Sequence, residues 1–252
     1  MLEVILLLLK GNFKRSKKLF LKHYHHYFNK KRVTNFFLPI SKDLIKNQND
    51  YRLVVYKNFD YKRSIFREVF EKFGSNKGGF FKYNNTIRHF YSDFYEECLK
   101  DKSIKNLLEI GIEFGGSLRA WSSLFPNANI YGADINKKYL FNEGKIKTFY
   151  TNQLDKNELE ILFKKLNYKK FDVIIDDGLH NYESNINTFE VLYPLLDTEK
   201  GIYIIEDISF NNLKKYYKYL NNKYDFKIIE CLNTNETFMN CVILIKKKIS
   251  NG

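Results

Sequence analysis

The chain has 252 residues and a net charge of +13, and 44% of its residues are hydrophobic, 17% aromatic and 28% charged. This composition excludes a disordered or collagen-like protein, and the length is enough for one α/β domain with a sizeable core. Three scattered cysteines, Cys98, Cys231 and Cys241, exclude a disulfide framework, so we expect free thiols in a cytoplasmic protein. The longest apolar run, residues 4–9, is too short to span a membrane.

Residues 1–70 show no strong periodicity, and we expect them to form a helical N-terminal extension. Nine basic residues and one acidic residue lie within 1–32, so this stretch carries +8 of the total charge of +13. We expect the extension to pack on the domain or on a second subunit of a homo-oligomer. Its interleaved aromatic and basic residues are also compatible with weak contact with an anionic membrane surface, or with RNA. His23, His25 and His26 lack the neighbouring acids or cysteines of a typical metal site.

From residue 105 onward, short apolar runs alternate with stretches of helical spacing. The runs are typical of buried parallel strands and cover 106–110, 128–134, 146–151, 171–176, 201–206, 225–231 and 238–245. Apolar residues at helical spacing occur at 118–125, 159–166 and 213–220. The alternation predicts an α/β domain over 71–252, with a doubly wound, mostly parallel seven-stranded sheet. Ligands should then bind at the carboxyl ends of the strands.

A glycine-rich turn follows the first predicted strand and leads into a helix. It reads E-x-G-x-x-x-G-G-S from Glu109 through Gly111 and Gly115 to Ser117. Glycines there allow a ligand to approach the backbone closely. The acidic residue before the first glycine favours S-adenosylmethionine over a nicotinamide cofactor. Asp134 ends the second strand and is placed to accept hydrogen bonds from both ribose hydroxyls of an adenosine, a role common to both cofactors.

Acidic residues end two further strands that should be neighbours in the sheet. Asp176 and Asp177 end the fourth strand, with His180 three residues later, and Glu206 and Asp207 end the fifth. Like charges this close are costly unless protons or a cation compensate them. Oxygen ligands without cysteine suit Mg²⁺ or Mn²⁺. The alternative is that these acids cap helices or pair with lysines.

Three segments together resemble class I S-adenosylmethionine-dependent methyltransferases. They are LLEIGIEFGGSLRAWSSLFPNANIYGADI (107–135), FDVIIDDGLH (171–180) and GIYIIEDI (201–208). More narrowly, they are similar to the metal-dependent sugar O-methyltransferases of the macrolide and tetracenomycin type, and the resemblance covers roughly 73–207. It includes Gly74-Ser75-Asn76-Lys77-Gly78 with His89, Tyr91 and Tyr95, a segment that lies near the active site in this family.

The resemblance implies a Rossmann-like methyltransferase fold and a role for each matched residue. The residues that would bind the cofactor S-adenosylmethionine are Glu109, Gly111, Gly115, Ser117, Asp134, Gln153 and Asp176. Asp177, Glu206 and Asp207 would bind Mg²⁺ or Mn²⁺, Asp177 and His180 would be catalytic, and His180 would be the general base. Asn152 stands where the family has an acid, and Leu179 where small residues are usual.

The resemblance implies methyl transfer to a sugar hydroxyl. A hydroxyl is a poor nucleophile at neutral pH, so a dication that lowers its pKa and a base that takes its proton are both useful. We expect the acceptor to be a nucleotide-linked or glycan sugar of a bacterial surface polysaccharide. The alternatives are an N-methyltransferase of a small metabolite, which would need no metal, a protein that binds or methylates RNA, and an inactive cofactor-binding subunit.

Overall fold

The computed structural model describes residues 53–56, 64–78, 80–81, 86–87, 91–231 and 241–246. The histidines at 23, 25 and 26, His89 and the expected helical part of the extension therefore lie outside the described residues. Within the described ranges, no helix combines the length and the apolar character needed to cross a membrane.

A mostly parallel sheet forms the centre of the domain, and all seven predicted strands belong to it. They are β4 (Asn106–Ile110), β5 (Asn129–Asp134), β7 (Ile146–Tyr150), β8 (Val173–Asp176), β9 (Ile202–Ile208), β10 (Asp225–Cys231) and β11 (Cys241–Lys246). Two short strands extend its edges, β1 (Leu53–Tyr56) beside β10 and β6 (Asn142–Glu143) beside β7. The order in the described chain is β1-β10-β11-β9-β8-β4-β5-β7-β6. Strands β5 and β7 follow on one side of β4 and strands β8 and β9 on the other, so the direction in which strands are added reverses at β4, as expected for a doubly wound sheet. Strand β11 is antiparallel to both of its neighbours.

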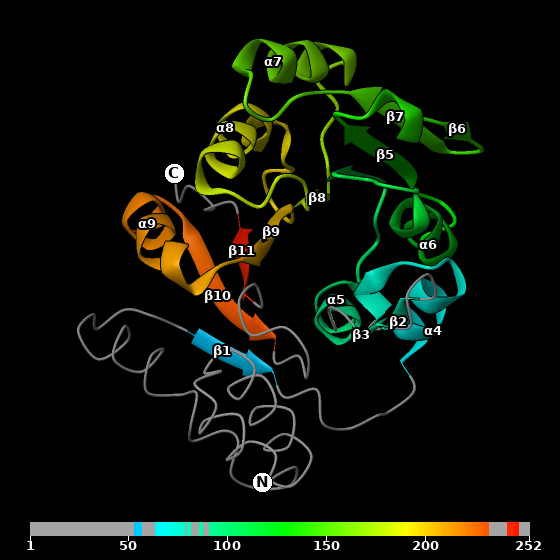
Figure 1. Ribbon diagram of the computed structural model, residues 1–252, viewed down its shortest axis with the longest axis horizontal. Coiled ribbons are helices and arrows are strands. Elements are labelled where there is room, and N and C mark those ends of the chain that lie inside the picture. Colours follow the sequence, from blue (N-terminus) through cyan, green and yellow to red (C-terminus); the bar gives the residue numbers. More distant parts are fainter. Residues whose placement is uncertain are drawn as a thin grey trace, which may run out of the picture. The chain divides into compact units, whose positions relative to one another are not determined.

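Helices cover both faces of this sheet. They are α4 (Ile65–Lys72), α5 (Ser92–Leu99), α6 (Gly116–Leu124), α7 (Lys156–Lys165), α8 (Tyr182–Leu192) and α9 (Phe210–Leu220). Figure 1 shows α4, α5 and α6 on one side of the sheet and α7, α8 and α9 on the other. The other elements of the described residues are the 3₁₀ turns η2 (Asn76–Gly78), η3 (Lys137–Tyr139) and η4 (Tyr193–Leu195), and a hairpin of β2 (Phe80–Phe81) and β3 (Thr86–Ile87).

The segment around α4 belongs to the core of the domain. The serine hydroxyl of Ser64 accepts a hydrogen bond from the Arg67 amide and caps the helix. Phe66 and Phe70 are buried, and their rings contact the ring of Trp121 on α6 edge to face. Helix α4 thus runs across residue 70, where the extension was expected to end, and β1 lies before it.

The carboxyl ends of the central strands approach each other closely at Gly111. This residue has a φ of +85°, and a Cβ atom there would lie 2.1 Å from the Asp177 carbonyl oxygen. Its amide donates to the Ala133 carbonyl at 2.8 Å, while the Asp177 amide donates to the Ile110 carbonyl at 2.9 Å. Only glycine fits at this point. The ends of β4, β5 and β8 are therefore fixed against one another at the edge where the sequence predicts the site.

Candidate functional site

A cavity of about 640 Å³ lies at the carboxyl ends of β4, β5, β8 and β9. Seven of the predicted site residues line it: Gly111, Ser117, Asp134, Gln153, Asp177, His180 and Asp207. The other four predicted residues, Glu109, Gly115, Asp176 and Glu206, are not in the lining. Residues of the α4–η2 segment, Phe73 to Asn76, form a further part of the wall.

Asp134 holds the glycine-rich turn in place. Its Oδ2 accepts hydrogen bonds from the amides of Ile112 at 3.0 Å and Glu113 at 3.2 Å, and its Oδ1 accepts from the Asn136 amide at 2.7 Å. Glu113 adopts the left-handed region with a φ of +41°, which this hydrogen bonding supports. The predicted ribose-binding acid and the turn therefore form one unit at the ends of β4 and β5.

Gly115 has a local role in this turn. It is the N-cap residue of α6 and has a φ of +74°, and a Cβ atom at this position would lie 2.3 Å from the Phe141 ring. The glycine is needed for the tight approach of the turn to Phe141, whose ring also lies 4.3 Å from the Arg119 guanidinium.

The amide of Gln153 is held in one orientation by buried neighbours. Its Nε2 donates to Asp176 Oδ1 at 2.7 Å and to Thr188 Oγ1 at 2.9 Å, and its Oε1 accepts from the Leu179 amide at 2.8 Å. Asp176 is fully buried, and burial raises the pKa of its carboxyl to about 6. Asp176 therefore acts beneath the cavity by orienting Gln153, which reaches the lining.

The raised pKa of Asp176 gives a testable dependence of stability on pH. Because the folded state binds this proton more tightly than the unfolded state, the folded chain carries more protons between about pH 4 and pH 6. The stability of the wild type relative to Asp176→Asn should therefore fall as the pH rises through this range and stay constant above it. Urea unfolding at several pH values measures the difference, and a difference that does not vary with pH would contradict the assignment.

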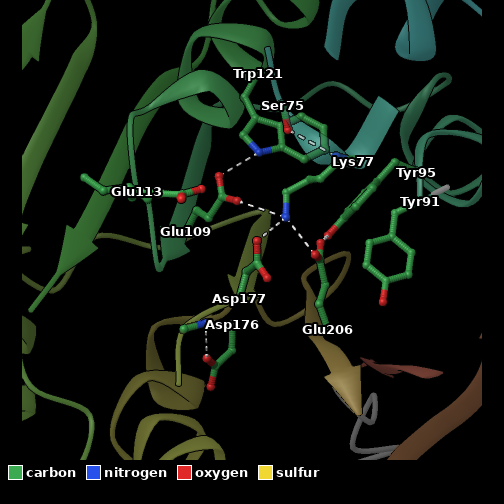
Figure 2. A network of polar contacts seen from close by, with 12 residues as sticks. Ser75, Lys77, Tyr91, Tyr95, Glu109, Glu113, Trp121, Asp176, Asp177 and Glu206 are labelled. Carbon is green, nitrogen blue, oxygen red and sulfur yellow. Dashed lines mark hydrogen bonds and ion pairs between the residues drawn. The ribbon is translucent and has the colours of Figure 1, made fainter. Parts of the chain in front are cut away.

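Lys77 is a site residue for which sequence reasoning predicted no role. Its buried Nζ lies 2.5 Å from Asp177 Oδ2, 2.7 Å from Glu206 Oε2 and 3.2 Å from Glu109 Oε1. Figure 2 shows this ammonium between the three carboxylates. Burial alone would lower the pKa of Lys77, but the facing carboxylates raise it well above its usual value, so the side chain is charged. The one signal in the sequence was its place in the Gly74–Gly78 segment.

Aromatic donors satisfy the remaining oxygens of the buried acids. The Tyr95 hydroxyl donates to Glu206 Oε1, and the Trp121 indole donates to Glu109 Oε2 at 3.0 Å. The Tyr91 hydroxyl donates to Asp207 Oδ1 at 2.5 Å. Burial raises the pKa of both Glu109 and Glu206, against the effect of the Lys77 ammonium. Glu109 and Glu206 thus lie in a buried polar network behind the cavity wall.

Asp177, His180 and Asp207 form a group that could hold a metal ion. One ligand atom from each lies within 4.8 Å of the others, and His180 Nε2 is 3.8 Å from Asp207 Oδ2. His180 and Asp207 have φ values of +55° and +54°, an uncommon conformation for residues other than glycine that is concentrated at functional sites. The two carboxylates are hard oxygen donors that suit Mg²⁺ or Mn²⁺, whereas an imidazole ligand would favour a softer transition metal. Glu206 is not in this group.

Known proteins resemble about half of the chain. A mycinamicin VI 2''-O-methyltransferase from Micromonospora griseorubida is 35% identical over 129 residues, which are 48% of this chain and 32% of that protein. A tetracenomycin-C rhamnosyl 3'-O-methyltransferase from Streptomyces olivaceus is 32% identical over 130 residues, with the same coverage. The chain thus spans about a third of the length of the curated relatives it matches. No family model matches the chain.

Solved structures confirm the fold. MycE methyltransferase from the mycinamycin biosynthetic pathway, in complex with Mg and SAH, superposes with a TM-score of 0.57 at 24% identity, covering 76% of this chain and 57% of that one. A Staphylococcus aureus structure titled as a putative caffeoyl-CoA O-methyltransferase gives 0.50 at 18% identity, covering 81% and 98%. The chain has the Rossmann-like methyltransferase fold, and its sequence resembles O-methyltransferases of antibiotic glycosides.

Proposed function

We propose that the protein is an S-adenosylmethionine-dependent, divalent-metal-dependent O-methyltransferase that acts on a sugar hydroxyl. The observation that carries this proposal is a single cavity with two kinds of wall. The turn held by Asp134 forms one side, and Asp177, His180 and Asp207 form the other. The similarity to O-methyltransferases of antibiotic glycosides supports the same activity.

The residues divide the work of the reaction between them. Gly111, Ser117 and Asp134 bind the methyl donor, with Gln153 at the same wall, and Asp177 and Asp207 hold the cation. Bound S-adenosylmethionine would supply the methyl group, and bound Mg²⁺ would lower the pKa of the acceptor hydroxyl. His180 Nε2 takes the hydroxyl proton, because it lies beside the two aspartates and faces the same cavity. The fixed backbone at Gly111 keeps the donor and acceptor halves of the cavity in register.

Binding of S-adenosylhomocysteine tests the donor half. Asp134→Ala should weaken this binding by on the order of a hundredfold in titration calorimetry. The variant loses the two charge-assisted hydrogen bonds that we expect from the ribose hydroxyls to the Asp134 carboxylate, worth about 2 to 4 kcal/mol together. Asp155→Ala is the matched control, since Asp155 caps α7 and is absent from the cavity lining. Unchanged affinity in Asp134→Ala would remove the assignment of the adenosyl site.

The acceptor class can be tested directly. We expect a nucleotide-linked or glycan sugar of a bacterial surface polysaccharide, whereas the named relatives act on antibiotic glycosides. Transfer of a labelled methyl group to nucleotide sugars, to polysaccharide fragments and to macrolide glycosides would separate these. Methylation of the macrolide glycosides alone would show that the acceptor is an antibiotic glycoside, as it is for the named relatives, and not a sugar of a surface polysaccharide.

A further inference from the structure

Strand β9 is irregular at its two acidic residues. The register between β9 and β11 shifts at this point, so Glu206 and Asp207 together oppose the single residue Val242, as in a β-bulge. Asp207 has a φ of +54°, in the left-handed region. Neighbouring side chains of a regular strand point to opposite faces of the sheet, and a bulge changes the direction of one of them. The bulge therefore releases these two acids from the alternation of the strand.

Two buried tyrosines at the start of α5 meet these acids. Tyr91 is the N-cap residue of α5, and Tyr95 lies one helical turn later. The Tyr91 hydroxyl donates to Asp207 Oδ1 at 2.5 Å, and the Tyr95 hydroxyl donates to Glu206 Oε1 (Figure 2). Tyr91 and Tyr95 are 1% and 0% exposed, so water does not compete for these hydrogen bonds. One helix thus holds both acids of the bulge.

We propose that Tyr91 is a positioning residue that fixes the carboxylate of Asp207 for cation binding. The hydrogen bond with Tyr91 engages Oδ1, while Oδ2 lies 3.8 Å from His180 Nε2. The group that could hold a metal ion consists of Asp177, His180 and Asp207, so Oδ2 is the oxygen that we assign to the cation. The inference rests on the metal dependence of the proposed function, and it adds the residue that orients one of the ligands.

The surroundings of Asp207 give this hydrogen bond its importance. The Asp207 side chain is 9% exposed, so little water is available to hold its carboxylate. A hydrogen bond from a buried phenol fixes the carboxylate before the cation arrives, and binding then needs little reordering. Removing a residue that orients a metal ligand commonly weakens metal affinity by about 10- to 100-fold. We expect an effect at the lower end of this range, because Tyr91 orients one ligand of several.

Metal affinity tests the proposal without any measurement of turnover. Mn²⁺ is titrated by calorimetry into the full chain, for the wild type and for Tyr91→Phe, which keeps the ring and loses only the hydroxyl. We expect Tyr91→Phe to bind Mn²⁺ about tenfold more weakly and to keep the wild-type affinity for S-adenosylhomocysteine. Tyr216→Phe is the matched control, because it removes another buried hydroxyl, which donates to Asn185 at 2.6 Å. It should leave the Mn²⁺ affinity unchanged.

The outcomes separate the inference from the proposed function. Unchanged Mn²⁺ affinity in Tyr91→Phe would overturn the inference and leave the proposed function intact. A parallel loss of S-adenosylhomocysteine affinity would also overturn it, because the variant would then disturb the whole cavity. A wild type that binds no Mn²⁺ would instead defeat the metal dependence of the proposed function, and the inference with it.

A double-mutant cycle tests whether Tyr91 acts through Asp207. Asp207→Asn should weaken Mn²⁺ binding by about tenfold or more. Adding Tyr91→Phe should then weaken it little further, since the carboxylate that the hydroxyl orients is already replaced. Losses that add up in the double variant would show that Tyr91 acts elsewhere, and would overturn the assignment.

Discussion

His180→Ala should lower kcat by a factor of about 10² to 10⁴ and leave the affinity for S-adenosylhomocysteine almost unchanged. The imidazole lies on the cavity wall, 3.8 Å from Asp207 Oδ2, and His180 has a backbone φ of +55° in the segment between β8 and α8. Asp134, in the donor half of the cavity, accepts its hydrogen bonds from the amides of Ile112, Glu113 and Asn136. Single-turnover methyl transfer and calorimetry measure the two quantities on the same preparation.

The same variant separates two roles for this imidazole. A general base can be removed without a large loss of Mn²⁺ affinity, whereas a ligand cannot. We expect His180→Ala to bind Mn²⁺ within threefold of the wild type. Near-normal turnover in His180→Ala, combined with a loss in His89→Ala, would move the proton acceptor to the upstream segment.

Removal of the metal should abolish methyl transfer, and added Mg²⁺ should restore it. Chelation with EDTA leaves Asp134 and the turn at Gly111 intact, so S-adenosylhomocysteine should still bind. Asp177→Asn should reproduce the chelated enzyme, because Asp177 supplies a ligand atom to the group with His180 and Asp207. Asp155→Asn is the control, since asparagine caps a helix as well as aspartate does. Undiminished transfer after exhaustive chelation would favour the N-methyltransferase alternative.

The regular part of the fold could be predicted because its central strands are short, apolar and mostly buried. The run at β8 has four buried residues and matches the short apolar run that is typical of a buried parallel strand. Helix α8 gave no such signal, because its buried positions Ser184, Asn185 and Thr188 are polar. Of these, Thr188 accepts a hydrogen bond from Gln153. The edge strands β1 and β6 are four and two residues long, too short for periodicity to indicate.

The lining of the site was more predictable than the network behind it. Asp134, Asp177 and His180 follow strand ends, where parallel topology brings side chains together. Lys77 lies 100 residues before Asp177 in the chain, and nothing in its local sequence indicates three acidic partners. Glu109 lies against Trp121 and Lys77, a contact that only packing decides, and its expected contact with the cofactor stays a prediction.

The long sequence separations of the Lys77 contacts have a consequence for the order of folding. Asp177 and Glu206 follow Lys77 by 100 and 129 residues, so the chain must close two large loops before the ammonium meets these acids. Contacts of this kind form slowly and late. The segment that carries Lys77 is synthesised before β8 and β9. The Lys77 side chain can nevertheless be buried only once these two strands have joined the sheet. We therefore expect the amides of α4 and η2 to gain protection from hydrogen exchange together with those of β9, and not ahead of them.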